Sequence, residues 1–241
     1  ANRIRVLLAG LIGNVMEWYD FAVYGYFAVT IGRLFFPSSD PSASLIGAFG
    51  AFAAGFLVRP LGGVVFGRIG DLSGRRRALS LSVITMAVPT VLMGLLPTHQ
   101  QIGIAAPIAV VVLRIIQGLS VGGEYTSSII YLTENAPSRQ RGFFAIWGLW
   151  GSVLGMLLGS GFGALMAHTL TPVQMEAWGW RLPFLLGALV AITGVVIRRD
   201  IGADEIDPEV KAPVRQTFGR FLPQVLRVMA LNIASSVGYY S

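Results

Sequence analysis

Residues 6–32 read VLLAGLIGNVMEWYDFAVYGYFAVTIG, an apolar run that carries two acidic side chains, Glu17 and Asp20. At about 1.5 Å per helical residue, the run is long enough to cross the ~30 Å hydrocarbon core of a bilayer. It is too long, and too charged in its middle, for a secretory signal peptide, although Arg3 and Arg5 precede it. We therefore predict a first transmembrane helix with carboxyl groups near its midpoint.

Similar apolar runs recur along the chain. Hydrophobic residues make up 54% of the 241 residues and charged residues 12%, whereas about 25% is usual in soluble domains. The sequence predicts an all-α polytopic membrane protein with six spans and the start of a seventh near Phe218. The predicted spans are 6–32, 45–67, 78–96, 104–130, 143–167 and 180–197.

The spans group into two membrane parts separated by one linker. We predict a six-helix amino-terminal bundle over 1–198, a cytoplasmic inter-bundle loop over 199–216, and the first helix of a second bundle over 217–241. The loop is rich in charged residues and holds two prolines, which disfavour a continuous helix. We expect the rest of the second bundle to be needed, so that this chain alone does not transport.

The basic residues predict the orientation. Fourteen of the 18 Lys and Arg residues fall in the amino-terminal segment and the loops on one side, and only Arg33 and Arg181 fall in the opposite loops. The positive-inside rule then places the amino terminus in the cytoplasm. Because most basic residues lie in short loops between spans, we interpret the net charge of +6 as an orientation signal and expect no nucleic-acid partner.

Two polar stripes run through the first and fourth spans. At about 100° per residue, each set falls on one side of its helix, and both lie near mid-membrane depth. The first stripe is Asn14, Glu17, Asp20 and Tyr24; the second is Arg114, Gln117, Glu124 and Ser128. We expect the two stripes to face one cavity.

A charge at the bilayer centre costs at least ~2.5–3.5 kcal/mol on insertion scales, so such residues are paired or face water. Glu17 or Asp20 could form an ion pair with Arg114 or Arg59 that only joins helices, but apolar packing could replace such a pair. The alternative is functional: Arg114 binds a substrate carboxylate or controls the protonation of a nearby acid. Glu17, Asp20 and Glu124 are then the candidate proton carriers. For Arg59, next to Pro60, a structural role and a gating role both remain open.

Catalytic and metal chemistry finds little support in the sequence. No cysteine occurs, which excludes disulfides, thiolate metal sites and cysteine nucleophiles. The G-x-S-x-G pattern from Gly118 to Gly122 lies inside an apolar helix, away from the strand-to-helix turn that a nucleophile elbow needs. No H-E-x-x-H or P-loop sequence occurs. We expect neither an enzyme nor a cofactor, and a proton as the coupling ion.

The fifth span repeats glycine at every fourth position. Gly151, Gly155, Gly159 and Gly163 leave one side of the helix almost bare. Small residues at this spacing allow two transmembrane helices to approach closely. We predict a helix-packing face here.

Several motifs resemble those of a known family. The loop after the second span, Gly67-Arg-Ile-Gly70-Asp71-Leu-Ser-Gly74-Arg75-Arg76-Arg77, resembles the signature loop of the major facilitator superfamily. The pattern Tyr131-x-x-Glu134-x-x-Pro137-x-x-x-Arg141-Gly142 resembles that of sugar-porter-like facilitators. Gly13-Asn14-x-x-Glu17-Trp18-Tyr19-Asp20-Phe21, Arg59-Pro60-Leu61-Gly62-Gly63, Gln117-Gly118-x-Ser120-x-Gly122-Gly123-Glu124-Tyr125 and Trp178-Gly179-Trp180-Arg181-x-Pro183-Phe184 extend the likeness over nearly the whole chain. Together they resemble the metabolite:proton symporter family.

That resemblance implies a twelve-helix fold of two six-helix bundles with a central site and alternating access. It implies a transporter of the bacterial inner membrane that moves a small organic anion or a zwitterionic osmolyte with a proton. Its partners would be the solute, the proton, the bilayer and the carboxyl-terminal half of the same transporter. Arg114 favours an anionic substrate such as a dicarboxylate.

In this interpretation, a cytoplasmic charge network holds one state of the transporter closed. Gly70 and Gly74 would permit a tight turn that brings Asp71 to the arginines. The predicted gating residues are Arg59, Gly67, Gly70, Asp71, Gly74, Arg75, Arg76, Glu134, Arg139 and Arg141. A solvated loop that only sets orientation is the alternative.

Two other functions remain open. A proton-coupled drug antiporter would share the fifth-span glycines, but Ser160 stands where the antiporter signature has a proline. A membrane sensor or scaffold that does not transport is the second alternative.

Overall fold

The computed structural model describes residues 3–199, 222–224, 226–227 and 229–230, without the side chains of Arg5, Arg75, Arg76, Tyr125, Thr126, Arg198 and Arg199. The chain forms two compact units, Ala1–Asp204 and Glu205–Ser241. In the second unit, the described residues are helical. The predicted loop lies outside the described residues beyond Arg199, so the predicted boundaries at 199–216 and 217–241 stay predictions.

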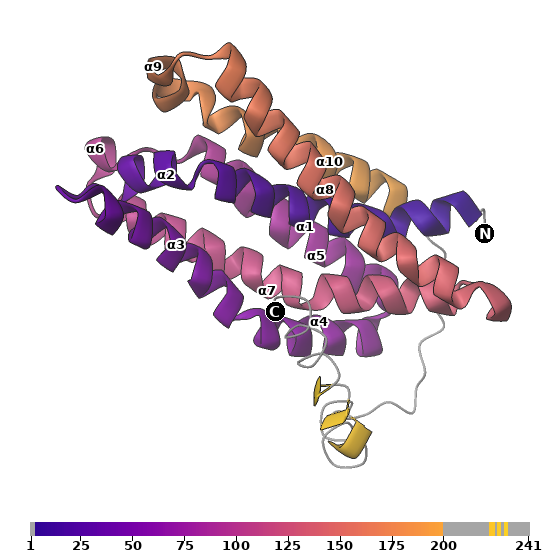
Figure 1. The fold of residues 1–241 in the computed structure, drawn as a ribbon. Helices are drawn as coiled ribbons and strands as arrows, with labels where there is room; N and C mark the ends of the chain where they lie inside the picture. The colour runs from indigo at the N-terminus through magenta and orange to yellow at the C-terminus, as the bar shows by residue number, and fades with distance from the viewer. Residues whose placement is uncertain (1–2, 200–221, 225, 228, 231–241) are drawn as a thin grey trace. The chain divides into compact units, whose positions relative to one another are not determined.

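The first unit is built from helices, and its described residues contain no strand, as the sequence predicted. Figure 1 shows the long helices running roughly alongside one another, with the short helices α6 and α9 at one end. The elements are α1 (Arg3–Tyr26), α2 (Ala28–Phe35), α3 (Pro41–Leu57), α4 (Arg59–Ser73), α5 (Arg75–Leu95), α6 (His99–Ile102), α7 (Ala105–Glu134), α8 (Arg141–Thr169), α9 (Pro172–Gln174) and α10 (Arg181–Arg199), with a 3₁₀ turn at Ser138–Gln140 and a π-helical turn at Met175–Gly179.

Five stretches of the described chain are long and apolar enough to cross a membrane: Val6–Tyr26, Pro41–Ser73, Arg77–Leu95, Ala105–Glu134 and Ser138–Thr169. A sixth is the pair Pro172–Gly179 and Arg181–Ile197, which bends by 46°. These match the six predicted spans in number and place. The spans could be predicted from local composition because each of them is apolar enough to lie in lipid.

Two predicted spans are interrupted. The second is divided into α3 and α4 at Val58, two residues before Pro60, which has no N–H to continue the helical ladder. The first, predicted over 6–32, is broken at Phe27, and α2 continues it to Phe35. The break makes Arg59 the first residue of α4.

The turn between α4 and α5 depends on one glycine. Gly74 has φ 90° and ψ 149°, a region open essentially to glycine alone. Gly70, predicted to share in the tight turn, lies inside α4, where its carbonyl accepts a hydrogen bond from the Gly74 N–H at 3.1 Å. The prediction of a glycine turn was therefore right for Gly74 and wrong for Gly70, because the helix continues to Ser73.

The glycine face of α8 packs against α1, which confirms the predicted packing surface. A Cβ atom on Gly155 would meet the carbonyl oxygen of Val15 and, at 2.9 Å, the amide nitrogen of Tyr19. One on Gly159 would lie 2.7 Å from the Cβ of Ala22. The backbones of α1 and α8 can approach this closely only because the side chains are missing.

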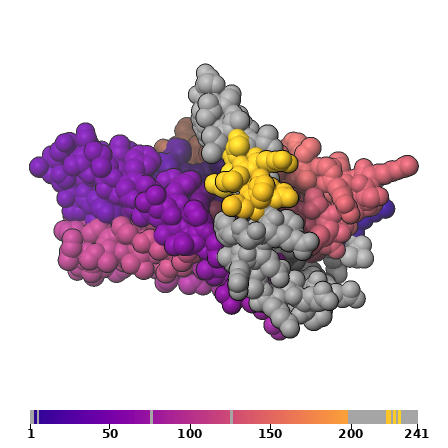
Figure 2. All heavy atoms as spheres, turned by 90° about the horizontal axis from the view of Figure 1, so that it is seen from below, coloured from indigo at the N-terminus to yellow at the C-terminus, as the bar shows by residue number. Residues whose placement is uncertain are grey.

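A second glycine contact joins the α3–α4 span to α7. A Cβ atom on Gly118 would overlap the carbonyl oxygen of Gly55, and one on Gly122 would overlap that of Arg59. Figure 2 shows residues of the α3–α4 span beside the pink surface of α7. This close crossing fixes Arg59 next to the polar interior of α7.

Candidate functional site: a buried polar interior between α1, α4, α5 and α7

The polar stripe of α1 is buried. Asn14, Asp20 and Tyr24 are 0% exposed, and Glu17 is 3% exposed. On a helix otherwise made of apolar residues, these side chains face neighbouring helices, as the spacing predicted. Each must therefore find its polar partners inside the protein.

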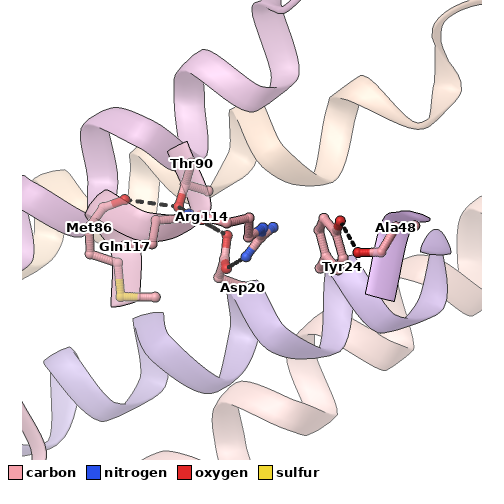
Figure 3. Close-up of polar contacts among 7 residues, drawn as sticks. All are labelled: Asp20, Tyr24, Ala48, Met86, Thr90, Arg114 and Gln117. Atoms are coloured by element: carbon pink, nitrogen blue, oxygen red, sulfur yellow. Dashed lines mark hydrogen bonds and ion pairs between the residues drawn. The ribbon is translucent and has the colours of Figure 1, made fainter. Parts of the chain in front are cut away.

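Asp20 and Arg114 form an ion pair in this interior (Figure 3). Nη1 of Arg114 donates to Oδ2 of Asp20 at 2.5 Å, and the two side chains are 2% and 0% exposed. We call Asp20 and Arg114 the inner pair. It joins α1 to α7, so the two predicted stripes meet here.

Gln117 and Thr90 complete the coordination of Asp20. Nε2 of Gln117 donates to Oδ1 of Asp20 at 3.0 Å and lies 2.7 Å from the Thr90 hydroxyl. That hydroxyl lies 3.0 Å from the same carboxylate oxygen and 2.9 Å from the Met86 carbonyl oxygen. Sequence reasoning missed Thr90. It directly follows Pro89, which interrupts the hydrogen bonding of α5, and this proline was the available signal.

Tyr24 supports the guanidinium from the other side. The Cζ atom of Arg114 lies 3.8 Å from the centre of the Tyr24 ring, a cation–π distance. The Tyr24 hydroxyl in turn donates to the Ala48 carbonyl at 2.8 Å (Figure 3). Three buried polar atoms nearby have no hydrogen-bond partner: Nε and Nη2 of Arg114 and Oε1 of Gln117.

The Arg114 guanidinium thus uses only part of its hydrogen-bonding capacity. Asp20 contacts Nη1, while Nε and Nη2, the edge that binds a carboxylate side-on, remain without hydrogen bonds. A small void lined by Arg114, Gln117 and Phe52 adjoins this region. The guanidinium therefore keeps two donors that a further acceptor group could use.

Glu17 pairs with Arg59, not with α7. Nη1 of Arg59 lies 3.7 Å from Oε1 of Glu17, which is longer than a hydrogen bond. The guanidinium also stacks on Phe56, with Cζ 3.7 Å from the ring centre, and lies 4.6 Å from the centre of Phe21. We call Glu17 and Arg59 the outer pair.

The outer pair lines a cavity of about 510 Å³ between α1, the α3–α4 break and α7. Its remaining lining residues are Trp18, Phe56, Pro60, Val121 and Gly122. The volume falls within the ~300–1,000 Å³ usual for small-molecule sites. Oε2 of Glu17 is buried and has no hydrogen-bond partner.

The prediction that both stripes face one cavity was too simple. Of the α1 stripe, Glu17 alone lines the 510 Å³ cavity, and none of the α7 stripe does. Nδ2 of Asn14 donates to the Ser128 hydroxyl at 3.0 Å, and Glu124 turns toward Ser82 of α5 and accepts a hydrogen bond from it. Helical spacing predicts which side of each helix is polar. It does not predict which residue of a neighbouring helix each polar side chain contacts.

Arg59 apart, the predicted gating residues Asp71 and Glu134 lie in the last turns of α4 and α7, and Arg139 and Arg141 follow α7. Asp71 is half-buried; Glu134, Arg139 and Arg141 are exposed. Gly67 and Gly70 lie within α4. The side chains of Arg75 and Arg76 lie outside the described residues, so the predicted charge network stays a prediction.

Comparison with known proteins identifies the family. The family model described as "Sugar (and other) transporter" matches residues 6–199, which cover the bundle described above. The chain belongs to this family. Proteins that resemble it include the glycine betaine/proline/ectoine/pipecolic acid transporter OusA of Dickeya dadantii, 43% identical over 80% of this chain and 39% of its own length. The alpha-ketoglutarate permease of Escherichia coli is 39% identical over 100% of this chain and 56% of its own length.

The chain spans about half the length of the curated relatives it matches. Among solved structures, the partially occluded inward-open form of the E. coli xylose transporter XylE superimposes with a TM-score of 0.75 at 19% identity, over 83% of this chain and 48% of that one. XylE is described as a major facilitator superfamily proton:xylose symporter. The fold of this chain is therefore that of the major facilitator superfamily, as its loop motifs predicted.

Proposed function

We propose that the chain is part of a secondary active transporter of the bacterial inner membrane, which moves a small organic anion or a zwitterionic osmolyte together with a proton by alternating access. Multi-pass helices, bacterial relatives and the 14 to 2 distribution of basic residues support this placement, with the amino terminus in the cytoplasm. The proposed partners are the solute, the proton, the lipid bilayer and the second half of the transporter. No cofactor is proposed beyond the coupling proton.

The observation that carries the proposal is the inner pair with its unfilled hydrogen-bonding edge. A buried ion pair contributes little to stability, because the desolvation of both charges offsets their attraction. The inner pair sits at the centre of the bundle with two guanidinium nitrogens unused. An ion pair that only joins two helices has no use for donors without hydrogen bonds. A site that binds a further group needs such donors.

Asp20 and Arg114 offer a mechanism for proton coupling. If Asp20 takes up a proton, its charge is removed and Arg114 loses its counter-ion. The guanidinium is then available to a substrate carboxylate, which supplies the missing negative charge. When the substrate leaves, Asp20 would lose its proton and pair with Arg114 again. Proton release and substrate release would then accompany each other.

The proposal is tested by solute uptake into proteoliposomes that contain the full-length transporter, with and without an inward proton gradient. We expect a solute of the anion or zwitterion class to accumulate only with the gradient. Accumulation that is indifferent to both the pH difference and the voltage would contradict proton coupling. A competition panel of dicarboxylates, betaines and lipophilic cations separates this function from drug antiport, since only an antiporter would respond to the cations.

A further inference from the structure

The outer pair has features that the proton-coupling role of the inner pair does not use. Glu17 and Arg59 face the 510 Å³ cavity together, and among the described residues that line it they are the acid and the base. Because one is an acid and the other a base, the lining carries no net charge when both are ionised. The cavity therefore presents a dipole, with a negative and a positive pole about 3.7 Å apart.

Both poles have unused bonding capacity. Oε2 of Glu17 and Nε of Arg59 are buried atoms without a hydrogen-bond partner, and the 3.7 Å contact between the two side chains is too long for a hydrogen bond. A buried polar atom without a hydrogen-bond partner destabilises the folded protein. A ligand that satisfies both poles at once would offset part of this loss of stability.

The walls around the poles favour a cation beside Glu17. Trp18 is the neighbour of Glu17 in the chain and lines the same cavity. The face of a tryptophan ring attracts ammonium groups, methylated ones included. On the opposite side, Phe56 stacks on Arg59 and holds its guanidinium in place for a carboxylate.

We propose that the outer pair and its cavity form a two-point binding site for a small zwitterion, whose ammonium group is held by Glu17 and the Trp18 ring and whose carboxylate is held by Arg59. This inference rests on the proposed transport function and narrows its substrate class. It also assigns Arg59 to substrate binding, beyond the gating and structural roles that the sequence left open, and it places the carboxylate at the outer pair before Asp20 takes up a proton and frees Arg114.

An anion fits this cavity less well than a zwitterion does. A carboxylate drawn to Arg59 would displace Glu17 from its only described cationic partner and leave a buried carboxylate uncompensated, which is strongly unfavourable. A dicarboxylate would add a second negative charge close to Glu17. A zwitterion replaces the Glu17–Arg59 contact with two new contacts of the correct sign, so no charge is left unpaired.

The first measurement uses the unmodified full-length transporter in detergent, without any gradient. Its thermal unfolding is followed with the zwitterions glycine betaine, L-proline and 4-aminobutyrate and with the anions succinate and α-ketoglutarate. We expect at least one zwitterion to raise the Tm in a saturable way, and to do so at lower concentration than either anion. A larger effect of an anion, or no effect of any of these zwitterions at millimolar concentration, would overturn the proposal.

The second measurement compares two isosteric variants of acidic residues. Glu17→Gln keeps the shape of the side chain and removes its charge, and we expect it to weaken binding of the best zwitterion about tenfold or more. Glu176→Gln removes the charge of an exposed residue that pairs with Arg33, and it should leave the affinity unchanged. Equal affinity of Glu17→Gln and the unmodified protein would overturn the proposal. If Glu17→Gln does not fold, the panel on the unmodified protein decides alone.

The two proposals fail in different ways. Zwitterion binding without gradient-driven uptake would contradict proton symport and leave the binding site intact. Gradient-driven uptake of a dicarboxylate, with no zwitterion bound, would keep proton symport and overturn the two-point site.

Discussion

Asp20 contacts side chains from two helices other than its own, α7 and α5. It accepts hydrogen bonds from Arg114 and Gln117 of α7, and its Oδ1 lies 3.0 Å from the Thr90 hydroxyl of α5. In lipid, no water replaces a lost partner. This one carboxylate therefore links α1 to both α5 and α7.

Paired neutral substitutions distinguish a coupling role of the inner pair from a purely structural one. Arg114→Gln alone leaves Asp20 uncompensated and should destabilise the full-length protein by about 3 kcal/mol. Adding Asp20→Asn removes the unpaired charge and should restore most of the Tm. Gradient-driven uptake should remain absent in the double variant, because Asp20, the proposed proton carrier, can no longer take up a proton. Uptake that returns together with stability would show that the pair only joins helices.

At the scale of the helix, glycine positions decide which elements approach closely. Gly155 and Gly161 lie on the same helix, α8, but on different sides of it. A Cβ atom on Gly155 would meet the backbone of α1, whereas one on Gly161 would meet nothing within 4 Å. The two positions therefore form a matched pair that separates helix packing from helix propensity.

Gly155→Ala should destabilise the protein by about 1–3 kcal/mol, because α1 must move to admit the methyl group. Gly161→Ala should be neutral or stabilising by up to about 1 kcal/mol, since alanine is the better helix former. Thermal unfolding of both variants in the same detergent measures the difference. Equal Tm values would contradict the close contact between α1 and α8.

At the scale of the whole molecule, the order of the helices puts successive loops at opposite ends of the first unit. The α2–α3 connection and α6 lie at one end, and the α7–α8 connection lies at the other (Figure 1). Ser38 in the first connection and Gln140 in the last are both exposed. The absence of cysteine from these 241 residues makes either position suitable for a single introduced thiol.

Labelling with a membrane-impermeant maleimide tests the proposed orientation. In a full-length background with no other cysteine, Ser38→Cys should react in intact cells. Gln140→Cys should react only after the membrane is permeabilised, because the positive-inside rule places its loop in the cytoplasm. The reverse pattern would show that the amino terminus lies outside.

The sequence by itself determined that the protein lies in a lipid bilayer, how many spans this part of it has, and which side of α1 and α7 is polar. Hydropathy and the 3.6-residue period are local properties, so residues such as Asn14 and Asp20 could be placed on one buried face without any knowledge of their neighbours. It also predicted the glycine face of α8, because a missing side chain permits close approach whatever the partner is.

Only the tertiary structure decided which charges meet. Spacing along one helix says nothing about the helix opposite, so the sequence left Glu17 and Asp20 with two possible arginines. Arg59, the first residue of α4 after the break at Val58, lies beside Glu17, and the packing of α1 against α7 brings Asp20 to Arg114. Thr90 and the 510 Å³ cavity likewise depend on the approach of several helices. Contacts between distant segments follow from packing, which no local pattern encodes.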